Sequence, residues 1–257
     1  MPISYQEIKY AIKHPFTLLE FIFNKFKLTK RARILNNGER IIIKDFNLVK
    51  KSTNINSIIH IKRYEWAKHF LTNSYVLDNG CGTGYGTNFL ANNKVKEIVG
   101  VDISKETISF AQKKYQRENL VFKQMNSLAL DFLDKTFDAV VSFDVIEHID
   151  EKFQEKFISE IYRVLKDGGI LLIGNPNSLL TRLKNPHHKK ELTLDEFESL
   201  LKVFFKDVKL YGENFILNGV NLRENWYKYK TKLKYHSLEI SESDYKNSYN
   251  LLAKCIK

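Results

Sequence analysis

The sequence predicts an α/β fold: a doubly wound, mostly parallel seven-stranded sheet with helices on both faces, preceded by a helical N-terminal extension. Two observations lead to this class. From about residue 58 onward, short apolar runs bounded by turn residues alternate with segments of helical periodicity. The first apolar run also ends in an acid and continues into alternating glycines, VLDNGCGTGYGT (76–87). Strands that alternate with helices pair in parallel through right-handed crossovers.

The expected elements follow one another along the chain. After the first strand, further strands are expected at 97–104, 119–124, 137–143 and 168–177, with helices at 106–116 and 151–165 between them. Thr193 and Glu196 have the spacing of a capping box, which predicts that another helix begins there. A sixth strand is expected at 204–214 and a seventh in the C-terminal AKCIK, where Cys255 would pack in the core.

The glycine-rich turn predicts a ligand site. Gly80, Gly82 and Gly84 form G-x-G-x-G, which lacks the third glycine of the dinucleotide fingerprint in either register. No Lys-Ser/Thr pair follows, so the phosphate-binding P-loop pattern is excluded too. Asp102 ends the second strand 18 residues beyond Gly84. An acid at this place can accept hydrogen bonds from both ribose hydroxyls, which predicts a nucleoside ligand.

Four segments, DNGCGTG, VDIS, SFDVIEHI and VLKDGGILLIGNPN, resemble in order and spacing the successive motifs of class I S-adenosylmethionine-dependent methyltransferases. The resemblance spans about residues 58–257 and implies a Rossmann-like fold with S-adenosyl-L-methionine as cofactor. The Glu-His-Ile segment resembles the corresponding segment of one branch of this family, which contains ubiquinone-type and sugar- or polysaccharide-modifying methyltransferases. Methyl transfer is a displacement at a sulfonium that is already activated by its charge, so such an enzyme mainly aligns the acceptor.

The resemblance implies a set of cofactor contacts. Asp78 would face the methionyl amino group, and Asp102 would hold the ribose. On a helix at 60–70, Arg63 would pair with the methionyl carboxylate and Tyr64 would shield the sulfonium; alternatively, this helix packs its aromatic face on the sheet. The full set is Arg63, Tyr64, Asp78, Gly80, Cys81, Gly82, Gly84, Asp102, Ile103, Asn126, Ser127 and Phe143. Asn126 and Ser127 would lie beside the adenine, and the family often has an aspartate in place of Asn126. Cys81 is interpreted as a small residue in a crowded turn.

The predicted catalytic residues are His148, Glu147 and His188. A histidine titrates near neutrality and can take the proton of an alcohol acceptor, a role that the Glu-His-Ile motif gives to His148. His187 and His188 are the other candidates, and the alternative is that His148 only caps a turn. No metal is expected. The one arrangement that could hold a divalent ion is Asp144, Glu147 and His148 on one helical turn, with His188 or His187. Certain RNA-end methyltransferases have a similar set, with a longer Glu in place of Asp144.

The acceptor would contact an insertion around residues 177–236. There, Arg223, Trp226, Tyr227 and Tyr229 could hold a phosphate or stack on a ring; a solvated insertion is the alternative. The leading prediction is O-methylation of a sugar, nucleotide-sugar or surface-glycan intermediate. Alternatives are N-methylation of a small, phosphorylated amine, methylation of RNA, or a non-catalytic cofactor-binding scaffold.

Charge and composition predict two regions, a basic amphipathic extension (1–58) and the methyltransferase domain (59–257). Of the net charge of +11, 11 − 4 = +7 falls in residues 1–51, and residues 16–27 form a largely apolar helix with one polar stripe. That helix could cover the site, pack in a homodimer or lie on an anionic membrane. Nucleic acid is not an expected partner. Two cysteines and the absence of a signal-like segment predict a cytoplasmic protein.

Overall fold

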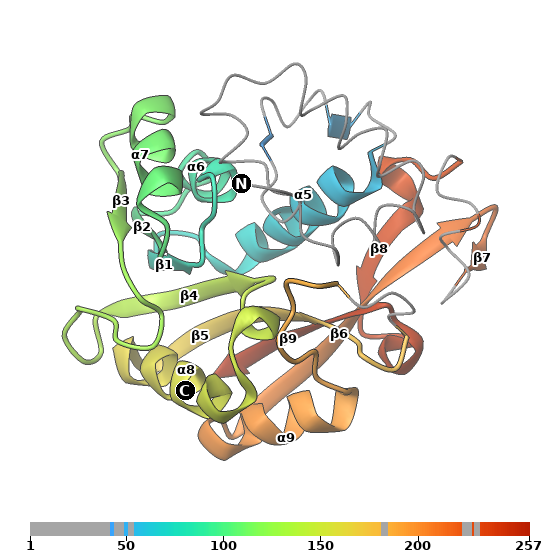
Figure 1. Ribbon diagram of the computed structural model, residues 1–257. Helices are drawn as coiled ribbons and strands as arrows, with labels where there is room; N and C mark the ends of the chain where they lie inside the picture. The colour runs from blue at the N-terminus through green and yellow to red at the C-terminus, as the bar shows by residue number, and fades with distance from the viewer. Residues whose placement is uncertain (1–41, 44–48, 51–53, 181–184, 223–227, 229–231) are drawn as a thin grey trace.

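A computed structural model of the 257-residue chain describes residues 42–43, 49–50, 54–180, 185–222, 228 and 232–257 (Figure 1). The predicted helix at 16–27 lies outside the described residues. So do the four acceptor-side candidates of the insertion, Arg223, Trp226, Tyr227 and Tyr229. No helix in the described part of the chain is long and apolar enough to cross a membrane.

A twisted sheet forms the centre of the structure. Its strand order is β3-β2-β1-β4-β5-β9-β6-β7, and β8 also pairs with β6. The pairings among β1 to β5 are parallel, whereas β9 is antiparallel to both β5 and β6. The strands are β1 (Tyr75–Asn79), β2 (Glu97–Asp102), β3 (Leu120–Gln124), β4 (Phe137–Phe143), β5 (Leu165–Pro176), β6 (Asp207–Leu217), β7 (Val220–Asn221), β8 (Leu238–Ser241) and β9 (Asn250–Ile256).

The predicted α/β class is confirmed, but the number of strands differs from the prediction. Seven strands stand where the sequence predicts them, and within the described residues β7 and β8 add two more beside β6. Both additions fall in the region that was expected to be an insertion or to follow it. The sixth strand begins at Asp207 because residues up to Phe204 continue the preceding helix.

Helices cover both faces of the sheet. Figure 1 shows α5, α6 and α7 on one face and α8 and α9 on the other. The helices are α5 (Ile55–Ala67), α6 (Tyr85–Ala91), α7 (Lys105–Lys114), α8 (Glu151–Val164) and α9 (Leu194–Phe204), with short 3-10 turns η1 (Lys68–Phe70), η2 (Ile146–His148), η4 (Tyr235–Ser237) and η5 (Tyr245–Asn247). The predicted capping box is confirmed: Thr193 caps α9, and Glu196 returns a hydrogen bond to its backbone.

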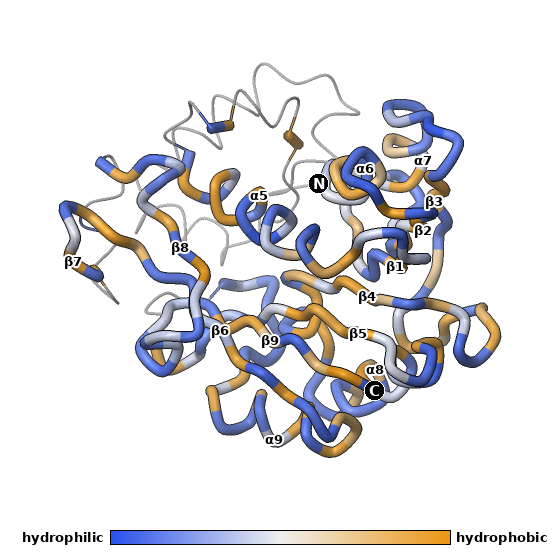
Figure 2. Tube along the Cα trace, turned by 180° about the vertical axis from the view of Figure 1, so that it is seen from behind, coloured by the Kyte–Doolittle hydropathy of each residue, from blue (hydrophilic) through white to orange (hydrophobic). Residues whose placement is uncertain are grey.

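The core lies on both sides of the sheet, because successive strand side chains point to opposite faces. Val76 packs in the cluster beneath α5 and α6, while the next residue, Leu77, packs in the cluster beneath α8 and α9. A strand buried on both faces reads as a continuous apolar run, which is why the sequence predicts these strands well. Figure 2 shows hydrophobic residues along the central strands β4, β5 and β9.

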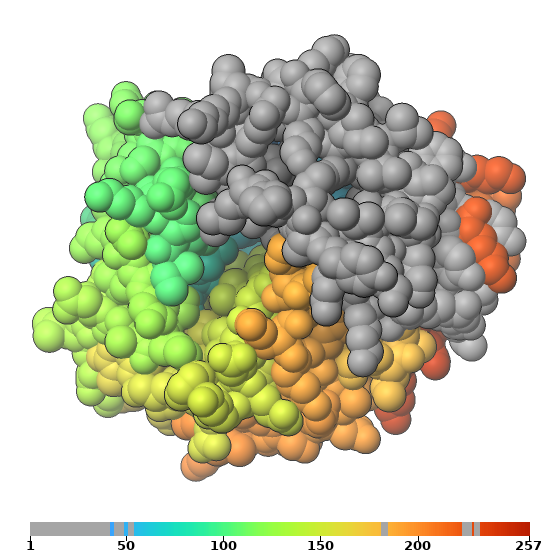
Figure 3. All heavy atoms as spheres, viewed as in Figure 1, coloured from blue at the N-terminus to red at the C-terminus, as the bar shows by residue number. Residues whose placement is uncertain are grey.

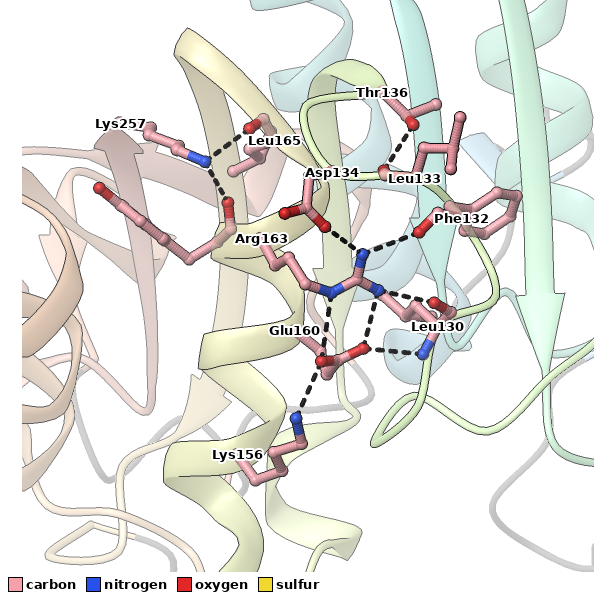
Figure 4. Close-up of polar contacts among 11 residues, drawn as sticks. Leu130, Phe132, Leu133, Asp134, Thr136, Lys156, Glu160, Arg163, Leu165 and Lys257 are labelled. Atoms are coloured by element: carbon pink, nitrogen blue, oxygen red, sulfur yellow. Dashed lines mark hydrogen bonds and ion pairs between the residues drawn. The ribbon is translucent and has the colours of Figure 1, made fainter.

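A polar network joins α8 to the segment between β3 and β4 (Figure 4). Arg163 donates to the carbonyls of Phe132 and Leu130 at 2.8 and 2.7 Å, and Glu160 accepts the backbone N–H of Leu130 at 2.9 Å. Burial alone would raise the pKa of Glu160, but hydrogen bonds from Arg163 and Lys156 lower it to about 2. The network fixes the chain directly after the predicted adenine-side residues.

Strand register brings the strand ends together at one edge of the sheet. Asn79 at the end of β1 pairs with Val101, and Asp102 at the end of β2 pairs with Gln124. Phe143, at the end of β4, pairs with Gly174 of β5. The carboxyl ends of parallel strands are where open α/β sheets bind ligands. The site is therefore built at this edge.

Candidate active site

The glycine-rich turn after β1 adopts a backbone that requires glycine. Gly80, Gly82 and Gly84 have φ values of 86°, 53° and 79°, in the left-handed region. A Cβ on Gly80 would lie 2.2 Å from a Val145 methyl group, and one on Gly84 would lie 2.7 Å from the Phe122 ring. A Cβ on Gly82 would meet nothing within 4 Å. The outer two glycines allow close packing, whereas the middle one presents bare backbone to open space.

Asp102 fixes this turn to the end of β2. Its two carboxylate oxygens accept the backbone N–H groups of Gly82, at 3.1 Å, and Ser104, at 2.8 Å. Each oxygen keeps a second lone pair. The carboxylate is partly exposed, so it can also accept hydrogen bonds from a diol placed over the turn.

Asp78 lies beneath the turn and is only 1% exposed. Its carboxylate accepts hydrogen bonds from the Thr87 hydroxyl at 2.7 Å and from the Tyr64 hydroxyl at 3.2 Å. Burial nevertheless raises the pKa of Asp78 to about 7. A cationic group beside this carboxylate would stabilise its charged form, so the environment fits the predicted amino-group contact. Sequence reasoning missed Thr87, whose hydroxyl becomes relevant only when α6 folds back over β1.

Tyr64 packs in an aromatic cluster beside the turn. Its ring lies 5.8 Å from that of Tyr85 and 5.4 Å from that of Phe143, both edge to face. A Cβ on Gly86 would lie 2.0 Å from the Tyr64 ring, so glycine permits this approach of α5 to α6. The aromatic face of α5 thus packs on the sheet, as the alternative interpretation expected. Shielding of a sulfonium by Tyr64 stays a prediction.

Arg63 occupies a different place from the one predicted. Its guanidinium, 2% exposed, donates to both oxygens of Glu213, at 2.5 and 3.0 Å, and to Asp144. These two carboxylates already use its planar fork, so in this structure Arg63 is not presented to a cofactor carboxylate. The sequence contains no local sign of the Arg63–Glu213 pairing. Glu213 on β6 lies 150 residues away in sequence, and no spacing pattern points to it.

The predicted cofactor contact Ile103 follows β2, and the predicted adenine-side residues Asn126 and Ser127 follow β3. Ile103 is 65% exposed, and Asn126 is exposed with its side-chain oxygen accepting the N–H of Leu128. Ser127 donates to the side-chain oxygen of Asn79 at 2.7 Å. The exposed aliphatic side chain of Ile103 suits the flat face of a base, and the polar side chains of Asn126 and Ser127 suit its polar edge. The adenine contact itself stays a prediction.

Cys81, within the turn, is buried. Burial, with Asp78 and Asp102 nearby, raises the pKa of its thiol well above the usual value. A thiol held in its neutral form is a poor nucleophile. The structure therefore favours the interpretation of Cys81 as a small residue that fits a crowded turn.

The three predicted catalytic residues come together beside the turn. Glu147 and His148 lie on η2, which directly follows β4, and Val145 of the same segment packs against Gly80. His188 comes from the loop after β5, and ligand-type atoms of Glu147, His148 and His188 all lie within 4.8 Å of one another. We refer to these three residues as the Glu-His-His cluster.

Asp144 does not join this cluster. Its φ of 55° places it in the left-handed region, and η2 begins only at Ile146, so one helical turn does not carry Asp144, Glu147 and His148 together. The Asp144 carboxylate instead pairs with Arg63. The four-residue metal arrangement considered from the sequence is therefore wrong with respect to Asp144.

Hydrogen bonds orient both histidines. His148 Nδ1 lies 3.2 Å from the carbonyl oxygen of His187, and His188 Nδ1 lies 2.5 Å from the Glu191 carboxylate. The structure therefore distinguishes the two adjacent histidines: His187 contributes its backbone, and His188 its ring. Sequence reasoning missed Glu191. The loop is held in place by the N–H of Lys189, which donates to the carbonyl of Glu147 at 2.7 Å.

The turn and the cluster are neighbours, because Val145, in the segment that carries Glu147 and His148, packs against Gly80. Figure 3 shows a recess between the green part of the surface and the yellow-to-orange part. The residues around the turn fit an adenosine with a charged methionine-like tail: bare backbone at Gly82, diol acceptors on Asp102, and a buried carboxylate at Asp78. Together they form a candidate nucleoside site, which lies next to the Glu-His-His cluster.

Comparison with known proteins agrees with this geometry. Residues 77–173 match the family Methyltransf_11, described as a methyltransferase domain. A probable S-adenosylmethionine-dependent methyltransferase of Mycolicibacterium smegmatis is 34% identical over 145 residues, covering 54% of each chain. The fatty-acid O-methyltransferase of the same organism is 35% identical over 98 residues, 38% of this chain and 35% of the other. The chain thus spans about half the length, or less, of the curated relatives it matches.

Solved structures share the fold. The S-adenosylmethionine-dependent methyltransferase of Thermotoga maritima, described as a possible histamine N-methyltransferase, superposes with a TM-score of 0.57 over 82% of this chain and 91% of its own, at 18% identity. The residues matched by the family include the glycine turn, Asp102, Glu147 and His148. Residues 77–173 of this chain therefore match a methyltransferase domain, and the surrounding fold is similar to that of a solved S-adenosylmethionine-dependent methyltransferase.

Proposed function

We propose that the protein transfers a methyl group from S-adenosyl-L-methionine to a hydroxyl oxygen of a small polar acceptor, with a sugar, nucleotide-sugar or glycan as the acceptor class. The observation that carries this proposal is the Glu-His-His cluster beside the glycine turn. A neutral amine can attack a sulfonium without prior loss of a proton, whereas an alcohol needs help to lose one. Basic side chains at this position therefore favour an oxygen acceptor.

The residues divide into two groups by role. Gly82 and Asp102 would hold the nucleoside, and Asp78 would face the cationic amino group. The cofactor supplies an electrophilic methyl group on a positively charged sulfur. His148 takes the acceptor proton, its ring oriented by the carbonyl of His187. The remaining task is alignment, which positioned groups on rigid strand ends perform well.

The acceptor class is tested by incubating the purified protein with S-adenosylmethionine and three kinds of acceptor: nucleotide-sugars, small phosphorylated amines and short RNA. Mass spectrometry with fragmentation then locates the added methyl group. We expect a methyl ether on a sugar hydroxyl. Methylation of an amine nitrogen or of RNA would contradict the proposed acceptor while leaving methyl transfer in place.

The role of His148 is tested with His148→Ala. We expect turnover at saturating acceptor to fall about 10²- to 10⁴-fold, the usual contribution of general acid–base catalysis, with little change in cofactor affinity. His69→Asn is the matched control, because His69 is exposed on η1. Unchanged turnover in His148→Ala would remove His148 from the mechanism and favour an amine acceptor.

A further inference from the structure

The Glu-His-His cluster contains a buried carboxylate with no hydrogen-bond donor among the described residues. Glu147 is fully buried, and neither of its side-chain oxygens has a hydrogen-bond partner in that part of the chain. An ionised carboxylate in such a place is strongly unfavourable unless a cation or donors compensate it. Ligand-type atoms of the His148 and His188 rings lie within 4.8 Å of a Glu147 carboxylate oxygen.

Each histidine of the cluster is oriented through its Nδ1 atom. His148 Nδ1 donates to a backbone carbonyl, and His188 Nδ1 donates to the Glu191 carboxylate. With the proton on Nδ1, the Nε2 lone pair is the one that can bind a ligand. Imidazole held in this way by a carboxylate or a carbonyl is the usual outer-shell arrangement of metal-binding histidines.

We propose that Glu147, His148 and His188 form a binding site for one divalent transition-metal ion. Two imidazoles and one carboxylate are a ligand set typical of zinc and related ions, which leave further positions open. Magnesium prefers an all-oxygen environment and fits this set less well. Asp144 is not a ligand, because Arg63 holds its carboxylate.

The distances require only a small closure of the cluster. Ligand atoms around an ion at ordinary bond lengths lie about 3–4 Å apart, and here they lie within 4.8 Å of one another. His148 and His188 are partly exposed, so an ion could reach their rings from solvent. The Asn185 amide nitrogen lies 3.0 Å from His188 Nε2, and ion binding would displace this contact. Asn185 and His188 lie on the same loop, so the amide can turn away without moving the sheet.

This site goes beyond methyl transfer, because it would bind its ion in the absence of cofactor and acceptor. It also lies next to the cofactor turn, through the contact of Val145 with Gly80. If the proposed function holds, the hydroxyl oxygen of the methyl acceptor would bind to the ion at an open coordination position. The ion would then lower the pKa of that hydroxyl. His148 would then act as a ligand, and the ion would take over activation of the acceptor.

The experiment measures metal binding directly on the full chain without cofactor. Protein freed of metal with a chelator is titrated with Zn²⁺ by calorimetry, and with Co²⁺ by its visible absorption, which reports ligation by nitrogen. We expect one ion per chain. Glu147→Gln and His188→Asn should each weaken binding at least about tenfold, and Glu191→Gln should weaken it about 10- to 100-fold through the orientation of His188.

His187→Asn is the matched control, since His187 contributes only its carbonyl to the cluster, and any residue keeps that group. It should bind Zn²⁺ within about twofold of wild type, because no ligand changes. Thermal melting of each variant shows that it is folded, and His188→Asn alone suffices if Glu147→Gln does not fold. The proposal is overturned if wild-type protein shows no saturable Zn²⁺ binding, or if Glu147→Gln and His188→Asn bind like wild type. Neither result is read from methyl transfer, so failure of the metal site and failure of the proposed function can be told apart. If the ion binds, His148 acts as its ligand and no longer as the base assigned to it under the proposed function.

Discussion

Replacing Arg63 with methionine is expected to lower the free energy of unfolding by about 3–5 kcal/mol, because it leaves the buried Glu213 carboxylate and the partly buried Asp144 carboxylate without their cation. Arg63 is 2% exposed, and Glu213 and Asp144 both depend on its guanidinium. Glu213 keeps one donor, the Asn250 amide at 2.6 Å. Methionine retains the apolar length of the side chain. The lost stability therefore reports the charge and hydrogen bonds of the guanidinium rather than its packing. Urea denaturation followed by circular dichroism gives the free energy.

Two further variants make this result specific. Arg117→Met removes an exposed arginine between α7 and β3 and should cost less than about 1 kcal/mol. The double variant Arg63→Met with Glu213→Gln should recover part of the loss, because removing both charges is far less costly than removing one. A free energy of unfolding for Arg63→Met within about 1 kcal/mol of the wild-type value would contradict this prediction. It would show that the ion pairs do not stabilise the packing of α5 on the sheet.

Asp102→Ala is expected to weaken the binding of S-adenosylmethionine about 100-fold or more. Two charge-assisted hydrogen bonds to a ribose are worth about 3 kcal/mol or more together, and 1.4 kcal/mol is a factor of ten. The substitution also removes the acceptor for the N–H of Gly82, which shapes the turn. Both effects weaken cofactor binding. Neither removes a contact of the hydrophobic core, since Asp102 is partly exposed.

Glu97→Ala is the matched control for Asp102→Ala. Glu97 is exposed and begins the same strand, β2, so it lies at the opposite end from the turn. We expect it to bind the cofactor like wild type. Equal binding by both variants would show that the acid at the end of β2 does not contact the ligand.

The sheet could be predicted because its strands are local and strongly marked. The apolar runs of β1, β2 and β4 each lead directly into an aspartate, and burial on both faces of the sheet accounts for the runs themselves. β8 gives no such signal. Its four residues, LEIS, follow a stretch rich in lysine and tyrosine, and only pairing with the distant β6 makes them a strand.

Site residues could be predicted where a local feature of the sequence, such as a glycine turn or the end of a strand, marks their position. Gly82 and Asp102 are marked by the turn and the strand end, and the structure places them in contact. Arg63 could not be placed in this way, because its partner Glu213 comes from a strand 150 residues away. His187 and His188 look equivalent in sequence. The structure distinguishes them, because the His187 backbone carbonyl contacts His148 whereas the His188 ring contacts Glu191.

The central claim is that the turn after β1 binds S-adenosylmethionine, and calorimetric titration of wild-type protein with this compound tests it most directly. We predict saturable binding of one molecule per chain, with a matching rise in melting temperature that Asp102→Ala largely loses. S-adenosylhomocysteine should compete, because it keeps the adenosine and the amino acid tail. Wild-type protein that is folded and yet shows neither heat of binding nor a thermal shift with either compound would contradict the assignment.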